Sequence, residues 1–185
     1  DPLDDIEIIN TELVLADMKT VERSLEKNQK LLNANKPEGK IAELALTGLL
    51  AHLNQGVAAR SFKRDSKQDE VIKNLFLLTD KPMIYVANID DNFSDKDQLS
   101  KAKKVALTNH SSFVAINGKL EAEMADFDEE EKKIILEDYN LKETGLNTLI
   151  KEAYNTLGLQ TFFTCGEMEV RGWTIKKNDC AVDAA

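Results

Sequence analysis

An apolar stretch that stops abruptly at polar residues constrains the fold more than any other part of the sequence. Residues 83–87 are apolar or aromatic, follow Pro82, and run directly into the motif Asn88-Ile89-Asp90-Asp91. This pattern predicts a buried strand with polar groups at its carboxyl end, which is where open α/β sheets bind ligands. An ordinary turn is the alternative for Asn88 and Asp91, because both residue types favour turns.

A second apolar run has the same ending. Residues 113–116 lead into the polar turn Asn117-Gly118-Lys119, and a modest helical pattern separates the two apolar runs. Strand, helix and strand form a crossover unit whose strands are expected to be parallel. The carboxyl ends of parallel strands lie at the same edge of a sheet, so we expect Asn88 and Asn117 to line one pocket.

Two long amphipathic patterns precede the first strand. Apolar residues recur at three- and four-residue steps from Ile6 to Leu32 and again from Ile41 to Val57, and the segment 35–37 contains a proline that breaks the pattern. Two long helices joined by a short turn are expected to pack antiparallel as a hairpin. The apolar stripes are explained by that packing alone, and an arm that contacts a partner is the alternative.

A group of basic residues follows the hairpin pattern in a chain whose net charge is -9. Such a group can bind phosphate, although basic clusters more often serve as solvated surface. The acidic balance of the whole chain argues against a general nucleic-acid binder, and we expect no DNA partner. The candidate residues for contact with a ribosome or another RNA are Arg60, Lys63, Arg64 and Lys67.

The composition narrows the class of protein. With 42% hydrophobic and 31% charged residues the chain is globular rather than disordered. It has no apolar stretch near the ~20 residues that a membrane helix needs, so no membrane contact is expected and the cytoplasm is the default compartment. The two histidines are isolated, which gives no support to a histidine-rich metal site.

The pattern changes after residue 158. Residues 159–164 and 169–175 are β-like runs on either side of a Cys-Gly turn, and they predict a hairpin that opens a new domain. The chain begins at Asp1 without a methionine and ends at Ala185 shortly after the start of a helical pattern. We therefore expect it to be part of a longer protein.

The sequence resembles the YchF group of translation-factor P-loop NTPases, the Obg-like ATPases. The resemblance covers nearly the whole chain and is weakest along the helical hairpin. Its last two stretches are the most specific. The matching stretches are 4–13 (DDIEIINTEL), 85–88 (YVAN), 121–123 (EAE), 158–164 (GLQTFFT) and 169–175 (EVRGWTI).

This resemblance implies an α/β fold that comprises the second half of a P-loop G domain with a parallel sheet. The implied insertion is an antiparallel helical hairpin of the coiled-coil type, and a truncated β-grasp TGS domain is implied at the end. The expected boundaries are 1–12 for the G-domain connection, 13–66 for the hairpin, 67–158 for the G-domain half and 159–185 for the start of the TGS domain.

The resemblance also assigns a site that binds the nucleotide base. In the family an Asn-x-x-Glu motif replaces the Asn-Lys-x-Asp of ordinary GTPases, and here it corresponds to Asn88, Ile89 and Asp91. A carboxylate can accept both N–H donors on one edge of guanine, whereas adenine offers one donor beside an acceptor. Ile89 takes the place of the lysine that ordinarily covers the base in GTPases, which fits an ATP-preferring protein. The carboxylate of Asp91 fits a GTPase, so the preference between ATP and GTP stays open. Asn117 and Gly118 are expected to support the base.

The implied parent protein binds the ribosome and hydrolyses ATP, or GTP, with Mg²⁺. These 185 residues contain no Gly-x-x-x-x-Gly-Lys-Ser/Thr phosphate loop, and they lack the metal-binding and water-positioning residues that phosphoryl transfer needs. By the resemblance those parts lie upstream of Asp1, so we expect no catalytic or metal-binding residue here and no activity from this chain alone. The alternatives are a GTP-preferring NTPase, a non-catalytic ribosome- or RNA-binding module, and a chaperone-like coiled-coil adaptor.

Overall fold

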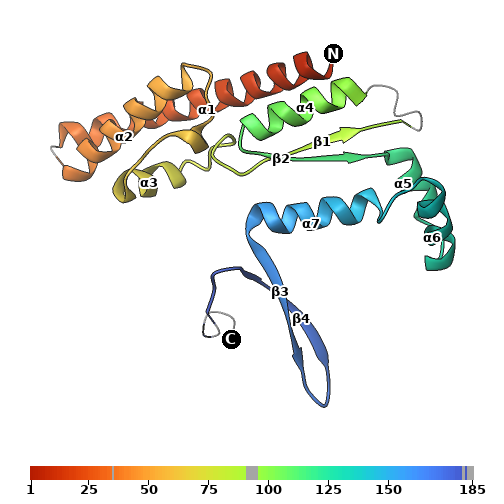
Figure 1. Cartoon of the computed structure of the whole chain (residues 1–185). Helices are drawn as coiled ribbons and strands as arrows, with labels where there is room; N and C mark the ends of the chain where they lie inside the picture. The colour runs from red at the N-terminus through yellow and green to blue at the C-terminus, as the bar shows by residue number, and fades with distance from the viewer. Residues whose placement is uncertain (35, 91–95, 181, 183–185) are drawn as a thin grey trace. The chain divides into compact units, whose positions relative to one another are not determined.

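The computed structural model describes residues 1–34, 36–90, 96–180 and 182 (Figure 1). Asp91 of the candidate base-binding motif lies outside the described residues. The chain divides into two compact units, Asp1–Pro82 and Met83–Ala185.

The first unit is built on two long helices, α1 (Pro2–Asn33) and α2 (Pro37–Leu53). They lie side by side and run in opposite directions (Figure 1), as the apolar periodicity predicts, although α2 ends before Val57. Val21 of α1 and Leu49 of α2 are fully buried between them. Burying side chains of this size stabilises the pair by roughly 1.5–3 kcal/mol each.

The close approach of the two helices depends on Gly39. A Cβ atom at this position would lie 3.1 Å from the backbone carbon of Leu31 and from the nitrogen of Leu32. Beside it, the buried Asn28 side chain donates a hydrogen bond from Nδ2 to the Gly39 carbonyl oxygen at 2.8 Å. This buried polar contact helps to fix the end of α1 to the start of α2.

A short 3₁₀ turn, η1 (Ala59–Ser61), and the helix α3 (Ser66–Lys73) complete this unit. Asp65 caps α3 by accepting hydrogen bonds from the N–H groups of residues 67 and 68, as capping residues do. Ile72 and Leu77 then pack into the core formed by α1 and α2. This packing places residues 67–82 in the same compact unit as the two long helices.

The second unit begins with the predicted crossover. β1 (Ile84–Asn88), α4 (Lys96–Thr108) and β2 (Ser112–Ile116) follow in order, and the two strands pair in parallel with Asn88 opposite Ile116. The parallel pairing confirms the prediction. The prediction that the first strand is buried is only partly right, because Val86 is 46% exposed. Among the described residues β1 has a neighbouring strand on one side alone, so it is less covered than an interior strand.

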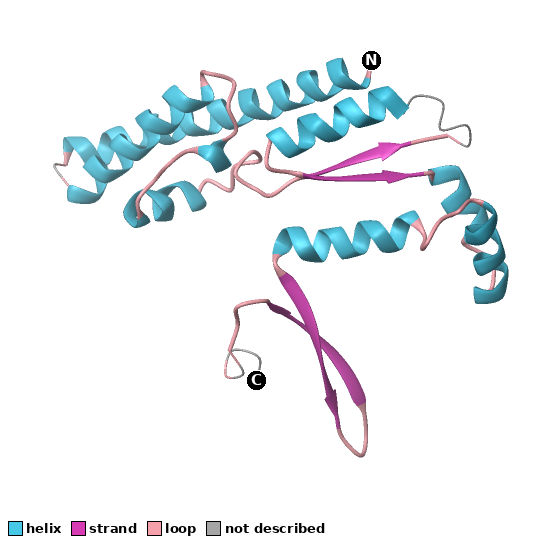
Figure 2. Ribbon diagram, viewed as in Figure 1, coloured by secondary structure: helices cyan, strands magenta, loops and turns pink. Residues whose placement is uncertain are grey.

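Three helices follow: α5 (Gly118–Met124), α6 (Glu129–Asp138) and α7 (Gly145–Leu157). Figure 2 shows α4 and α7 on opposite sides of the strand pair, and both helices pack against β2. The start of β2 is tied to α7 because the Ser112 hydroxyl donates to the Glu152 carboxylate at 2.5 Å. The same hydroxyl lies 3.1 Å from Oγ1 of Thr156.

The described chain closes with an antiparallel hairpin of β3 (Leu159–Cys165) and β4 (Val170–Lys176), as predicted. Phe162 pairs with Trp173, and the guanidinium of Arg171 lies 4.4 Å from the centre of the Trp173 ring. The indole N–H of Trp173 donates to the Thr164 hydroxyl at 2.9 Å. No helix within the described ranges is both long and apolar enough to cross a membrane.

Candidate functional site

A side-chain hydrogen bond joins the carboxyl end of β1 to the residues that follow β2. The backbone N–H of Gly118 donates to Oδ1 of Asn88 at 3.0 Å. Gly118 is the first residue of α5, and a Cβ atom there would lie 3.1 Å from the same oxygen. The structure therefore brings together one residue from each of the two polar strand ends that the sequence singled out.

This contact determines which part of the Asn88 side chain can face a ligand. A backbone N–H only donates, so the Asn88 atom opposite Gly118 is the carbonyl oxygen of the amide. The amide nitrogen, with its two N–H groups, points away from that contact, and the Asn88 residue is exposed. The strand end thus presents an oriented hydrogen-bond donor.

Ile89 continues the parallel pairing for one residue beyond β1. Its N–H donates to the carbonyl oxygen of Ile116 at 2.8 Å, and the residue is half-buried. The backbone at this point is therefore held to β2 immediately after the exposed amide of Asn88.

Asn117 caps the amino terminus of α5, the helix that it precedes. Its side-chain Oδ1 accepts from the N–H of Leu120 at 3.0 Å and so caps α5, and the residue is only 7% exposed. A cap of this kind typically stabilises a helix by about 1 kcal/mol. Its side chain thus fixes the first turn of α5, and with it the Gly118 N–H.

Sequence reasoning matched Glu121 only as part of a family motif and gave it no role. Oε1 of Glu121 accepts from the N–H of Gly145, the first residue of α7, at 2.5 Å. A Cβ atom at Gly145 would lie 2.8 Å from Cγ2 of Ile116 and 3.0 Å from that carboxylate oxygen. The only signals in the sequence were a glycine at the start of one helical pattern and an acid in an earlier one, and neither reveals the pairing across 24 residues.

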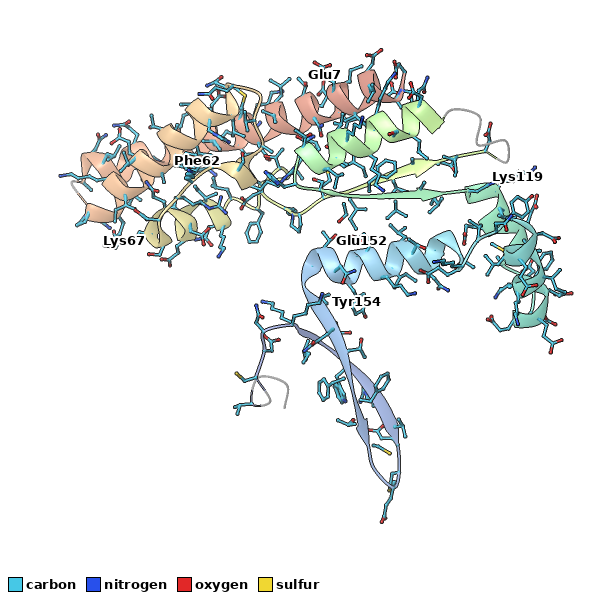
Figure 3. The ribbon with its side chains drawn as sticks, viewed as in Figure 1. Glu7, Phe62, Lys67, Lys119, Glu152 and Tyr154 are labelled. Atoms are coloured by element: carbon cyan, nitrogen blue, oxygen red, sulfur yellow. The ribbon has the colours of Figure 1, made fainter. Side chains whose placement is uncertain are left out.

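A cavity of about 740 Å³ lies beside this contact, between α5, α6 and the start of α7. Gly118 and Glu121 both line it, together with apolar side chains such as Met124 and Leu146. Charges of both signs surround it, since Glu129 and Lys132 of α6 also contribute. Lys119, next to Gly118, is labelled in Figure 3 and lies in the first turn of α5.

Two of the four basic candidates serve the structure of the first unit. Arg64 forms a two-pronged ion pair with Asp80, with N–O distances of 2.8 and 3.1 Å, and a third bond of 2.8 Å from Nε to Asp69. The hydrogen bond with Asp80 raises the pKa of the Arg64 guanidinium above its usual value. Arg60 donates from its backbone N–H and from Nη1 to the carbonyl oxygen of Thr79.

The other two basic candidates are directed to solvent. Lys63 and Lys67 are exposed, and Figure 3 shows Lys67 at the start of α3. The structure thus divides the four residues into a pair that holds the fold and a pair that can meet a partner. Within the described residues no group of three His, Cys, Asp or Glu side chains is placed to hold a metal ion.

No family model matches the chain. Curated proteins match it over its whole length. The "Ribosome-binding ATPase YchF" of Bacillus subtilis is 39% identical over 189 residues, which cover 100% of this chain and 52% of that protein. The protein of the same name from Escherichia coli O157:H7 is 36% identical over 185 residues, which cover 100% of this chain and 51% of that protein.

A solved structure gives the same result at the level of the fold. The structure of the Schizosaccharomyces pombe YchF GTPase matches with a TM-score of 0.86 at 29% sequence identity, and the match covers 100% of this chain and 51% of that one. The chain therefore spans about half the length of the relatives that it matches. Together the sequence and structure comparisons show that the chain is similar, over its whole length, to about half of a YchF-family protein.

Proposed function

We propose that the longer protein to which this chain corresponds is a ribosome-binding NTPase, and that Asn88 helps to bind the purine base of its nucleotide. The observation that carries the proposal is the hydrogen bond from Gly118 to Asn88, because it leaves an exposed amide donor at the carboxyl edge of a parallel sheet. The relatives are named as ribosome-binding ATPases or as a GTPase.

The oriented amide of Asn88 suits any purine. Adenine and guanine both carry an acceptor nitrogen at N7, to which an amide N–H can donate. Asn88 would then recognise a purine without distinguishing ATP from GTP. Ile89, the next residue, supplies apolar surface for the face of the base.

ATP and GTP differ at the other edge of the base, and we propose that Asp91 contacts that edge. A carboxylate there accepts both N–H donors of guanine, which favours GTP. The lack of a lysine at position 89 favours ATP, as in the ATPases that the chain resembles. We propose ATP as the nucleotide, and a GTP-preferring enzyme is the competing assignment.

Phosphate binding and hydrolysis are not assigned to these residues. The sequence has no phosphate loop, and the described residues offer no carboxylate cluster that fits Mg²⁺. We propose that this part of the protein binds the nucleotide base and supplies surfaces that contact the ribosome. The proposed compartment is the cytoplasm.

The remaining elements receive roles by the same proposal. Residues 13–66 would form a coiled-coil arm inserted into the G domain. Residues 1–12 would connect this arm to the G domain, and residues 67–158 would form the second half of that domain. Residues 159–185 would begin the TGS domain. A non-catalytic RNA-binding module is the second candidate, and the exposure of Lys63 and Lys67 favours it.

The test is nucleotide binding by the full-length protein, measured with ATP, GTP and CTP. We expect both purine nucleotides to bind more tightly than CTP, and N88A to lose about 3- to 10-fold in purine affinity, the value of one hydrogen bond. N74A is the matched control, because Asn74 is an exposed asparagine of the other unit. Equal affinity for CTP and ATP, or an N88A protein that binds ATP as the wild type does, would refute the assignment.

A further inference from the structure

The first turns of α5 and α7 are joined by Glu121, and this contact bears on the Asn88 amide. We propose that Glu121 is a positioning residue for base binding: it holds the start of α5 against α7 and thereby fixes the Gly118 N–H that orients Asn88. The inference rests on the proposed function, since it concerns the same base-binding amide.

The contacts form a continuous series within the second unit. Gly118 donates to Asn88 at 3.0 Å, and Glu121 accepts from Gly145 at 2.5 Å. Residues three apart on a helix lie on the same face, so Gly118 and Glu121 are adjacent on α5, and both line the same cavity. Displacing Glu121 therefore displaces the helix turn that carries the Gly118 N–H.

The far end of the series is anchored to the sheet. α7 packs along β2, and its Glu152 and Thr156 side chains contact the Ser112 hydroxyl at the start of that strand. Figure 3 labels Glu152 on α7. The helix to which Glu121 binds is thus fixed relative to β2, and β2 is paired with the strand that ends in Asn88.

Tight packing leaves little freedom at either hydrogen bond. Gly145 has no room for a Cβ atom between Ile116 and the Glu121 carboxylate, and Gly118 has little room beside Asn88. The carboxylate is also placed at the amino terminus of α7, where the helix dipole favours negative charge. A charged acceptor makes a stronger hydrogen bond than a neutral one, so this contact holds the two helix starts together more firmly than an amide would.

The test compares ATP with its 7-deaza analogue, which carries carbon in place of N7. In the wild-type full-length protein, loss of the Asn88 bond should lower the affinity for the analogue about 3- to 10-fold. In E121A, and independently in G145A, the ratio of the two affinities should fall towards 1. E121Q keeps an acceptor oxygen, so it should retain most of the ratio.

E123A is the matched control, because Glu123 lies on the same helix, is exposed, and forms a long ion pair of 3.9 Å with Lys119. Its affinity ratio should equal that of the wild type. The ratio compares two ligands on one sample, so a smaller fraction of folded protein leaves it unchanged. This property separates positioning of the amide from a general loss of stability.

Each outcome decides one question. A wild-type protein that binds both nucleotides equally would refute base binding by Asn88 itself. A wild-type protein that prefers ATP, together with E121A and G145A variants that keep the full preference, would leave base binding intact and overturn the role of Glu121. Loss of the preference in both alanine variants, with recovery in E121Q, would support it.

Discussion

The Thr79 hydroxyl donates to the buried carboxylate of Asp17 at 2.6 Å, although the two residues are 62 positions apart. The backbone N–H groups of Leu78 and Thr79 also donate to Asp17, at 2.8 and 2.7 Å. Thr79 in turn accepts from the N–H of Ala59 at 2.9 Å. One carboxylate on α1 thus holds the chain segment that follows α3.

We expect D17A to lower the free energy of unfolding of the first unit by about 3 kcal/mol or more, because buried donors left without acceptors cost about 1–3 kcal/mol each. D17N should cost less, since its amide oxygen still accepts. Urea unfolding followed by far-UV circular dichroism measures the effect. E22A, at an exposed site on the same helix, should change stability by no more than about 0.5 kcal/mol.

The contact between α1 and α2 at Gly39 predicts a contrast between two glycines of one helix. G39A places a methyl group against the backbone of residues 31 and 32, which cannot move alone, and should destabilise by about 1–3 kcal/mol. G48A meets only the ring edge of Phe62, at 3.2 Å, and a side chain can rotate. G48A should therefore be nearly neutral, and equal losses of stability in the two variants would contradict this account.

Phe76 adopts a left-handed backbone conformation, with φ of 52°, while its residue is 77% exposed. This conformation costs a residue with a Cβ atom roughly 1–2 kcal/mol, whereas glycine accepts it freely. F76G should thus raise the melting temperature. F76A keeps the Cβ atom and should not, so the comparison of the two variants in thermal unfolding isolates the backbone contribution.

The ion pairs of Asp69 predict an acid-dependent stability. The hydrogen bond from Lys73, with a further one from Arg64, holds the pKa of the Asp69 carboxyl below its ordinary value. A lowered folded-state pKa stabilises the protein above the unfolded pKa, near about 3.9, and this stabilisation is lost as the pH falls through the folded-state pKa.

D69N should accordingly be less stable than the wild type at neutral pH, and the difference should shrink below about pH 4 as the wild-type carboxylate takes up a proton. Melting temperatures of the two proteins across this range give the measurement. A difference that stays constant down to acid pH would mean that the charge of Asp69 is not its cause.

Local patterns predicted most of the elements and one half of the candidate site. Apolar periodicity located α1 and α2, and the order strand, helix, strand gave the parallel pairing that brings Asn88 to Gly118. Both inferences rest on residues that are near in sequence or on rules of chain connection. The side-chain contacts of Arg64 with Asp80 and of Glu121 with Gly145 could not be obtained in this way, because they depend on how separate helices and loops pack.

The position of the single tryptophan has a practical consequence. Trp173 lies on β4 with the Arg171 cation over its ring, so its fluorescence reports on the environment of the terminal hairpin. If α1 and α2 unfold separately, that emission stays largely unchanged while the loss of helix is visible in circular dichroism. Following both signals in one titration would show whether the two units melt together or as separate cooperative steps.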